Sequence, residues 1–496
     1  MNNHKIIVNN LLYCGKIWLE EVEFMKTRTR FAPSPTGFMH IGNLRTAIFE
    51  YLVAKHDKGD FILRVEDTDQ NRKVEGAIDF IYDTLKLCNI DISEGPNNEG
   101  NFGPYIQSER LELYKHYAEE LVKMGKAYYC FCTEETLEKM REYADKKKIP
   151  FMYDGRCSHL TKEEIDEKIK NGEKYVIRQK MPKEGISIVH DVVYGDIKVE
   201  NKVLEDQILL KSDGYPTYNF ANVIDDHLME ISHVIRGNEY LSQTPKYNLL
   251  YEAFGWNAPT YIHVPMVLGE DGNKLSKRNG DASFMDLYNE GYLPEAVVNY
   301  LVLLGWSPDK NQELFSMNEL IENFDANRIS KSPSSYDIKK LRWFNQKYIK
   351  NLSDEDYLKF VRPFLTIDVS DKSEEWINKL LLIYKEHISY GKEINDVVGI
   401  FFNSNISISE ENKAFLESDE NIPVVINAYK EELSKIKEWN VPNIAEVINI
   451  VKEKTGVKGK LLYMQMRIKI SGVEHGPELP DEIYLIGQEE VIKRLS

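Results

Sequence analysis

The chain has 496 residues and a formal net charge of −17 at pH 7, with 63 Lys and Arg against 80 Asp and Glu. Charged residues make up 29% and hydrophobic residues 42%, which excludes a disordered or fibrous protein and leaves a globular one of roughly two to four domains. The longest apolar run, 296–306, contains Asn299 and is too short to span a membrane, so no membrane association is expected. Five cysteines in a chain of this length argue against a disulfide scaffold and favour a reducing compartment.

Residues 1–25 differ from the rest of the chain. Two short apolar clusters, Ile6–Val8 and Leu11–Tyr13, are separated by asparagines and lack a small-residue cleavage site, so a signal peptide is not indicated. We expect residues 1–25 to be an N-terminal extension that is either disordered or translated from a misassigned start.

The segment from Arg30 to Arg45 is the most informative in the chain. Prolines and Gly37 delay a helix that then begins near His40-Ile-Gly42-Asn43, where Asn43 is able to cap it. A strand, a glycine turn and a helix N-terminus form a phosphate site, because free backbone N–H groups and the helix dipole face an anion. The alternative is an ordinary buried corner with a satisfied histidine.

Further along, Phe61–Val65 reads as a strand and Val74–Cys88 as a helix, which predicts a parallel sheet of βαβ units. This pattern breaks from about Pro104 to Leu210, where a helix over 111–123 and a β-like run over 186–189 are expected. It resumes at Ser212 and ends at Ser276, and beyond Asp281 the chain is almost entirely helical in pattern. The predicted fold is therefore a Rossmann-like α/β domain with an α+β insertion, followed by an all-α C-terminal half.

The inserted region carries Cys130-Phe-Cys132 and, further on, Cys157-Ser-His159. Three thiolates and an imidazole are a closed tetrahedral ligand set that suits a structural Zn²⁺ ion. Residues at i and i+2 of a strand point the same way, so each pair is able to chelate through one short segment. The alternative is chance spacing of reduced, metal-free thiols.

A tight turn at Asp271-Gly272 leads into Lys274, Lys277 and Arg278. Three cations on one loop are able to move onto a triphosphate and neutralise charge as pyrophosphate leaves. A solvated charged turn is the alternative.

The segment Lys331–Lys350 is strongly basic in spite of the acidic average, and RNA is bound by such local patches. Aromatic residues interleave with its cations, a mixture suited to phosphate contact and apolar anchoring. An amphipathic helix with a cationic solvent face explains the same pattern, and the two interpretations are compatible. The cations and aromatics are Lys331, Lys339, Lys340, Arg342, Lys347 and Lys350, with Tyr336, Trp343, Phe344 and Tyr348.

The two nucleotide-binding segments together resemble the paired ATP-binding motifs of class I aminoacyl-tRNA synthetases. The longer context is similar to the bacterial type of glutamyl-tRNA synthetase from about Lys26 to the C-terminus. The segments that carry this resemblance are Pro33-Ser-Pro-Thr-Gly37, Arg64-Val-Glu66-Asp-Thr-Asp69, Gly103-Pro-Tyr-Ile-Gln107-Ser108-Glu-Arg110, Ser212-Asp-Gly-Tyr-Pro-Thr-Tyr218 and Lys340-Leu-Arg-Trp-Phe-Asn345.

The resemblance implies ATP-dependent ligation of L-glutamate to tRNA(Glu) in two steps, through glutamyl-adenylate, with release of pyrophosphate and then AMP. It also implies Mg²⁺ bound with ATP, a structural Zn²⁺, and a cytoplasmic monomer that needs tRNA even for the activation step. Positioning and charge neutralisation then supply the rate, because neither step needs a protein nucleophile.

The resemblance also assigns residues. His40, Asn43, Lys274 and Lys277 are implied as catalytic contacts to the ATP phosphates, with Gly42 and Ser276 in the ATP site. Asn43 departs from the histidine usual at its position but keeps a hydrogen-bond donor. The glutamate contacts are implied to be Arg30, Ser34, Glu66, Tyr218, Asn222 and Arg236, and the metal ligands Cys130, Cys132, Cys157 and His159. Each also has a structural interpretation, as a surface acid or a core aromatic for example.

The implied domains are residues 26–105 and 211–267 for the two halves of the Rossmann-like catalytic domain, and 106–210 for an insertion that binds the tRNA acceptor end. Residues 268–350 form the lysine loop and a stem-contact domain, and 351–408 and 409–496 form two helical anticodon-binding domains. The family's arginine that rejects glutamine tRNA falls near His387, where this chain has none, so added charging of tRNA(Gln) is a hypothesis, with strict refusal of that tRNA as the alternative.

Three alternatives remain at this level. The first is a small-molecule nucleotidyltransferase of similar fold, which the helical C-terminal half disfavours. The second is a non-catalytic tRNA-binding relative, which the retention of His40 and Lys277 disfavours. The third is a glutamine-activating enzyme, which ATP–pyrophosphate exchange with each amino acid distinguishes.

Overall fold

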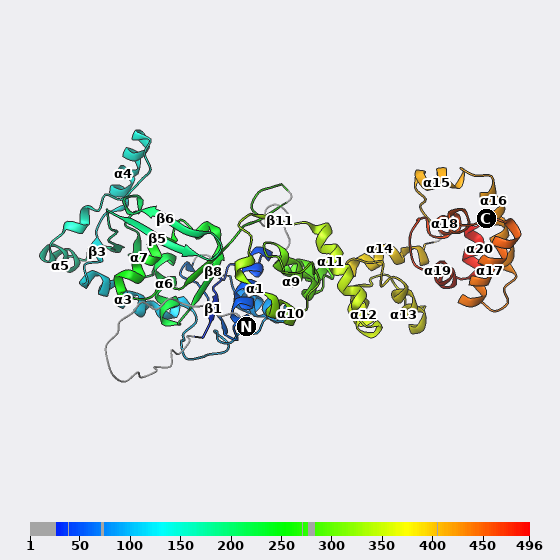
Figure 1. The fold of residues 1–496 in the computed structure, drawn as a ribbon, viewed down its shortest axis with the longest axis horizontal. Helices are drawn as coiled ribbons and strands as arrows, with labels where there is room; N and C mark the ends of the chain where they lie inside the picture. Colours follow the sequence, from blue (N-terminus) through cyan, green and yellow to red (C-terminus); the bar gives the residue numbers. More distant parts are fainter. Residues whose placement is uncertain (1–25, 38, 71–73, 270, 276–282, 404) are drawn as a thin grey trace, which may run out of the picture.

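The computed structural model describes residues 26–37, 39–70, 74–269, 271–275, 283–403 and 405–496, and it is elongated (Figure 1). The α/β part lies at one end of the molecule and a group of C-terminal helices at the other, with further helices between them. The extension predicted for residues 1–25 lies outside the described residues. No described helix has the length and apolarity that crossing a membrane requires.

A parallel sheet forms the centre of the α/β part. β1 pairs with β2 and β8 pairs with β9, each in parallel register. The amide of Ser232 donates to the carbonyl of Arg28 at 3.0 Å, so β8 lies beside β1. The parallel sheet expected from the sequence is thus confirmed, with β1 (Arg28–Phe31), β2 (Asp60–Leu63), β8 (His233–Gly237) and β9 (Thr260–Val264).

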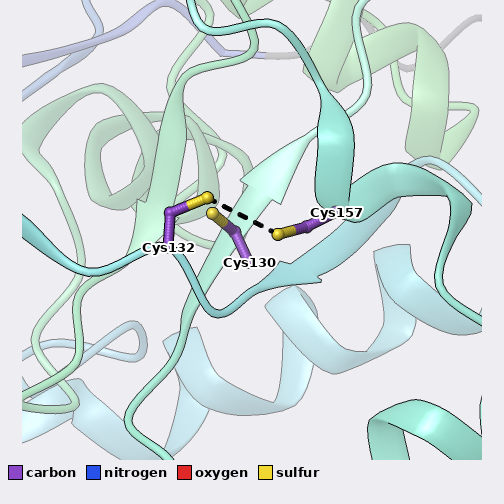
Figure 2. Close-up of side chains that lie close together, drawn as sticks. All are labelled: Cys130, Cys132 and Cys157. Atoms are coloured by element: carbon purple, nitrogen blue, oxygen red, sulfur yellow. Dashed lines mark hydrogen bonds between the residues drawn. The ribbon is translucent and has the colours of Figure 1, made fainter. Parts of the chain in front are cut away.

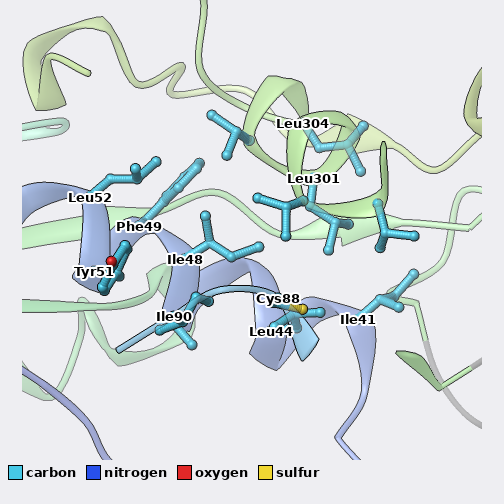
Figure 3. Packing of buried hydrophobic residues seen from close by; sticks show 14 of the residues in the cluster. Ile41, Leu44, Ile48, Phe49, Tyr51, Leu52, Cys88, Ile90, Leu301 and Leu304 are labelled. Carbon is cyan, nitrogen blue, oxygen red and sulfur yellow. The ribbon is translucent and has the colours of Figure 1, made fainter. Parts of the chain in front are cut away.

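α1 (Ile41–His56) follows β1 and is buried on most sides. In Figure 3 its residues Ile41, Leu44 and Ile48 lie close to Leu301 and Leu304, at the end of α9 (Pro294–Leu303). Burying each such aliphatic side chain contributes about 1.5–3 kcal/mol. This packing fixes the N-terminal end of α1 relative to the sheet.

The helices predicted near the start of the chain are present. The pattern over 74–88 forms α2 (Ala77–Leu87), which begins after Gly76 in a left-handed conformation (φ +76°). The helix predicted over 111–123 is α3 (Leu111–Lys123), whose buried Tyr114, Ala118 and Leu121 recur at helical spacing.

The inserted region contains its own antiparallel sheet of β3 (Ala127–Cys130), β4 (Val176–Gln179) and β7 (Ile208–Leu210). α4 (Glu134–Lys147) and α5 (Lys162–Lys170) lie at the far end of the α/β part (Figure 1). The β-like run at 186–189 belongs to the longer β5 (Ile186–Asp191), which forms a hairpin with β6 (Gly195–Glu200). β5 also joins the main sheet beside β9, since the amide of Val192 donates to Tyr261 at 3.0 Å.

The rest of the chain is mostly helical, as predicted. α6 (Tyr218–Leu228) and α7 (Thr244–Phe254) pack with α3 inside the α/β part. After β9 come β10 (Val267–Leu268), α8 (Phe284–Glu290), α10 (Met317–Asn323), β11 (Ser334–Ser335) and α11 (Ile338–Asn351). Two apolar clusters follow, the first built on α12 (Asp354–Val361), α13 (Glu374–Ile383) and α14 (Ile394–Val398). The second is built on α16 (Asn421–Ser434), α17 (Val441–Thr455), α18 (Lys460–Ser471), α19 (Leu479–Ile486) and α20 (Gln488–Arg494), beside α15 (Glu410–Leu416).

Candidate functional site

A pocket of about 520 Å³ opens at the carboxyl ends of β1, β2, β8 and β9. The chain runs from β1 toward β2 on one side and β8 lies on the other, so the pocket sits where ligands bind in open α/β sheets. Of the described residues that were predicted to bind ATP or glutamate, all but Asn222 line it: Arg30, Ser34, His40, Gly42, Asn43, Glu66, Tyr218, Arg236 and Lys274.

The N-terminus of α1 forms one wall of this pocket. His40 caps the helix, because its Nδ1 accepts a hydrogen bond from the Gly42 amide at 3.1 Å. The expectation that Asn43 caps the helix is therefore wrong, since the Asn43 amide already donates to the His40 carbonyl at 2.9 Å within the first turn. With Nδ1 accepting, the proton of a neutral His40 ring lies on Nε2. The positive end of the helix dipole faces the pocket beside this ring.

The loop that carries Lys274 forms a tight turn against β10. Gly272 has φ +74°, and the Gly269 amide donates to the Asn273 carbonyl at 2.8 Å. Lys274 Nζ lies 2.9 Å from Glu239 Oε1. Burial raises the pKa of Glu239, but the hydrogen bond and charge of Lys274 outweigh it and lower that pKa below its usual value. Ser276 and Lys277, the other residues predicted here, lie outside the described residues.

Behind the pocket lies a network of buried charges. Asp226 accepts from Arg30 Nε at 2.9 Å and from Arg64 Nη1 at 2.7 Å, and Arg64 Nη2 donates to Glu66 at 3.0 Å. Burial alone raises the pKa of Asp226, yet the two arginines hold it below its usual value. Arg30 was predicted to bind a substrate carboxylate, and here its Nε side is occupied by Asp226, while its Nη1 lies 3.5 Å from Glu50.

The other predicted glutamate contacts, Glu66, Ser34, Tyr218 and Asn222, come from three separate segments of the chain. Burial raises the pKa of the Glu66 carboxyl, against the opposing effect of Arg64. The Glu66 amide donates to the Pro33 carbonyl at 3.0 Å, which holds Glu66 near Ser34. Tyr218 begins α6, and Asn222 lies one turn later on the same face. Within the described part of the chain, Asn222 Nδ2 makes no hydrogen bond.

Arg236, at the end of β8, has surroundings unlike those of Arg30. Its Nε donates to His263 Nε2 at 3.1 Å and its Nη2 donates to Thr244 Oγ1 at 2.9 Å. Only 6% of Arg236 is exposed, and no acidic side chain among the described residues forms an ion pair with it. A buried guanidinium is costly without a counter-charge, so this corner of the pocket is suited to an incoming carboxylate.

Several residues in or behind the pocket were not predicted from the sequence. Arg45 is 3% exposed, donates from Nη1 to the Leu304 carbonyl at 2.6 Å and from Nη2 to the Pro265 carbonyl, and burial lowers its pKa to about 10. It thereby connects α1 to β9 and α9. The sequence offered one signal for Arg45, namely an arginine on the apolar face of a predicted helix. Nothing in the sequence indicated Glu239, His263 or Asp226, since tertiary contact alone gives them their partners.

A second candidate site lies in the inserted region (Figure 2). The Sγ atoms of Cys130, Cys132 and Cys157 all lie within 4.8 Å of one another, and those of Cys132 and Cys157 are 3.7 Å apart. His159, the predicted fourth ligand, is not in this group, because Cys157 and His159 lie in a 3-10 turn, where residues i and i+2 do not point the same way. The hydroxyl of Tyr153 instead lies 3.2 Å from Cys130 Sγ and 3.4 Å from Cys132 Sγ.

The basic segment predicted to contact RNA forms α11 and the residues before it. Phe344 is buried in the core, and Lys340 and Lys350 form ion pairs of 2.7 Å with Glu313 and Glu386. The interpretation as an amphipathic helix therefore accounts for the apolar face of α11, which packs into the core. Exposed cations such as Lys339 remain on the other face.

Comparison with known proteins gives a consistent result. Residues 26–343 match the model described as tRNA synthetases class I (E and Q), catalytic domain, and residues 356–496 match an anticodon binding domain. A glutamate–tRNA ligase of Clostridium botulinum (strain Hall) is 50% identical over 480 residues, covering 95% of this chain and 97% of that protein. A glutamate–tRNA ligase of Clostridium novyi (strain NT) is 48% identical over 476 residues, with the same shares covered.

Two solved structures are similar over nearly the full length. One is a glutamate tRNA ligase from Elizabethkingia meningosepticum in complex with its amino acid, with a TM-score of 0.84 and 37% identity over 95% of this chain and 98% of that one. The other is a glutamate–tRNA synthetase from Elizabethkingia anophelis, with a TM-score of 0.85 and 36% identity over 95% and 99%.

Proposed function

The chain belongs to the glutamate–tRNA ligases, a family of class I aminoacyl-tRNA synthetases, and we propose that it ligates L-glutamate to tRNA(Glu) through glutamyl-adenylate. In the first step a glutamate carboxylate oxygen attacks the α-phosphorus of ATP, and pyrophosphate leaves. In the second step the terminal ribose hydroxyl of tRNA attacks the activated carbonyl, and AMP leaves.

One observation carries this proposal: a single pocket contains both a helix N-terminus and a buried arginine without an acidic partner among the described residues. The N-terminus of α1 suits the phosphates of ATP, and Arg236 suits a carboxylate. Their shared pocket brings the two reacting groups of an adenylation together, which supplies much of the rate through positioning.

For ATP, we assign the phosphate contacts to His40, Asn43, Lys274 and Lys277, with Gly42 and Ser276 beside them. A Cβ at Gly42 would lie 3.3 Å from His40 Nδ1, so glycine leaves room for the ring that caps α1. Lys274 has to leave Glu239 to reach a phosphate. The exchange is feasible because an exposed ion pair is worth only about 0–1 kcal/mol.

For glutamate, we assign the side-chain carboxylate to Arg236 and the ammonium group to Glu66 and Ser34. Tyr218 lines the same end, and we assign Asn222, one turn later on α6, as a further polar contact behind it. Arg30 borders the site while Asp226 holds its Nε side.

Two metals belong to the proposal. Mg²⁺ enters the pocket with ATP, held mainly by phosphates and water, as is usual for this cation in nucleotide sites. The other metal-binding group is the cysteine cluster. Zinc fits that cluster: tetrahedral Zn²⁺ with bonds of about 2.3 Å separates its sulfur ligands by about 3.8 Å, close to the observed 3.7 Å. Bound there, zinc holds the inserted region in shape, with the Tyr153 hydroxyl nearer to the thiols than His159 is.

We also propose that the enzyme acts in the cytoplasm as a monomer, consistent with free thiols at Cys88, Cys130, Cys132 and Cys157. We further propose that it charges tRNA(Gln), because His387 lies near the place expected for a discriminating arginine. Labelled glutamate and both purified tRNAs test this: the wild type is expected to charge both, and His387→Arg to lose the second. Refusal of tRNA(Gln) by the wild type contradicts it.

Glutamate-dependent ATP–pyrophosphate exchange, with and without total bacterial tRNA, tests the main proposal. We expect exchange only with tRNA, and loss of at least about 100-fold in Lys277→Ala because a phosphate charge is left unneutralised. Lys86→Ala, an exposed lysine on α2, is the matched control and should exchange like the wild type. Absence of exchange with any amino acid would show a tRNA-binding protein without this activity.

A further inference from the structure

Asp191 and His263 form a buried pair behind Arg236, on strands that lie side by side. Asp191 ends β5 and His263 lies in β9, and the two side chains are fully buried. Asp191 Oδ2 lies 2.7 Å from His263 Nδ1 and also accepts from the His263 amide at 3.1 Å. Its other oxygen accepts from the amides of Val193 at 3.0 Å and Tyr194 at 2.8 Å. The carboxylate is therefore held in one orientation.

This contact determines which nitrogen of His263 carries the proton. A carboxylate only accepts, so Nδ1 of His263 donates to Asp191. Burial lowers the pKa of the His263 imidazole, which favours a neutral ring with Nε2 as an acceptor. Nε2 faces the Nε–H of Arg236 at 3.1 Å, and a guanidinium only donates. Both ends of the ring therefore require the same tautomer.

A second acceptor and three aromatic rings complete the environment of Arg236. Thr244 Oγ1 accepts from Nη2 at 2.9 Å and donates to the Tyr240 carbonyl at 2.9 Å. The guanidinium carbon lies 5.4, 4.5 and 5.5 Å from the ring centres of Tyr240, Tyr247 and Tyr261. Among the described residues these hydrogen bonds use two of the five guanidinium N–H groups, and the others remain for a ligand in the pocket.

We propose that Asp191 and His263 are positioning residues, which hold Arg236 in one orientation for the side-chain carboxylate of the amino acid and so set the preference for glutamate over glutamine. The inference rests on the proposed function. A fixed planar guanidinium donates to both oxygens of a carboxylate. The side-chain amide of glutamine instead turns its NH₂ group toward one N–H of the guanidinium, so that two donors face each other. If Arg236 were free to rotate, it would avoid this contact between two donors, and the preference for glutamate over glutamine would be lost.

Two substitutions of the same residue separate the two contacts of the ring. His263→Asn places an amide near the Nδ1 position and keeps the contact with Asp191 but loses the acceptor for Arg236. His263→Gln reaches the Nε2 position and keeps that acceptor. In tRNA-dependent exchange, we expect His263→Asn to raise KM for glutamate about 10–100-fold with a smaller change in kcat and an unchanged KM for ATP. His263→Gln should retain most of the affinity for glutamate.

Asp191→Asn is a second test, because it changes only one atom. Its NH₂ group opposite His263 would require Nδ1 to accept, which moves the ring proton to Nε2 and sets it against the Nε–H of Arg236. We expect the same rise in KM for glutamate. Sulfamoyl analogues of glutamyl-adenylate and glutaminyl-adenylate, titrated by calorimetry with tRNA present, should show the preference for the glutamyl compound shrinking at least 10-fold in Asp191→Asn and His263→Asn.

The outcomes separate this inference from the function on which it rests. A wild type that prefers the glutaminyl analogue, or binds neither, contradicts the proposed function. A wild type that prefers the glutamyl analogue, with variants that keep this preference or lose both analogues equally, contradicts the positioning role alone. Equal behaviour of His263→Asn and His263→Gln also contradicts it.

Discussion

Replacing Asp226 with asparagine removes one negative charge from between two buried arginines. The carboxylate accepts from Arg30 Nε and Nη2 at 2.9 and 3.3 Å and from Arg64 Nη1 at 2.7 Å. Asp226 is 4% exposed, Arg30 is 3% exposed and Arg64 is fully buried. Water therefore cannot replace the lost partner, and the two guanidinium groups are left repelling each other. Among the described residues, Glu50, Glu66 and Asp225 remain as their acidic neighbours.

The size of the effect follows from these contacts. Removing one partner of a buried ion pair costs about 3–5 kcal/mol, because the remaining charge is left uncompensated. Asparagine keeps one acceptor oxygen, which returns about 1 kcal/mol. We expect Asp226→Asn to destabilise the catalytic part by about 3 kcal/mol, which lowers its Tm by roughly 6–12 °C.

Differential scanning calorimetry of the full chain measures this loss in the transition of the catalytic part. Lys139→Ala is the control, because it removes an exposed ion pair with Glu135 and should shift Tm by less than about 2 °C. A shift of less than about 2 °C in Asp226→Asn would refute the reasoning. It would show that the cost of burying Asp226 as an anion already cancels its attraction to the arginines.

Three further predictions concern other parts of the molecule. Burial raises the pKa of Glu482 to about 7 beside Arg467, so its contribution to stability is complete below about pH 4.5 and is lost as pH rises through 7, by about 3 kcal/mol. The free energy of unfolding of the distal helices should therefore be larger at pH 5 than at pH 8 in the wild type, and this pH difference should shrink in Glu482→Gln. A pH difference that is unchanged in the variant would contradict the assignment to Glu482. Gly291→Ala should cost at least about 2 kcal/mol, because φ is +93° and the new Cβ would lie 2.4 Å from Gly391; an unaltered Tm contradicts it. Zinc measured by mass spectrometry of the purified protein should fall from about one per chain to near zero in Cys157→Ser, and retention of zinc would exclude the thiol cluster as its site.

Local patterns in the sequence predicted much of the fold. The helix predicted over 111–123 matches α3 at both ends, and the βαβ order predicted a parallel sheet. These predictions succeed because apolar periodicity and glycine or proline boundaries act over a few residues. The motifs around His40 and Lys274 also led to the pocket, since each motif is contiguous in the chain.

The sequence was less informative about how individual side chains are directed and which partners they have. Arg30 was predicted to contact the substrate and lines the pocket, but the sequence did not show that Asp226 of α6 occupies its Nε side. Asn43 was expected to cap α1, but His40 does so, because backbone geometry at the start of the helix brings its ring back onto the Gly42 amide. His159 was expected beside the cysteines, but the turn that carries Cys157 directs it elsewhere.

By itself the sequence determined the chemistry that is present: cations and a glycine turn for phosphates, arginines for carboxylates, and cysteines at chelating spacing. The tertiary structure decided which of these groups are open to a ligand and which are already paired. Arg30 and Arg236 are the same residue type, each at or near the end of a strand, and both are buried. One meets the carboxylate of Asp226 and the other a neutral His263, because α6 brings Asp226 to Arg30 while β9, the strand beside β8, brings His263 to Arg236.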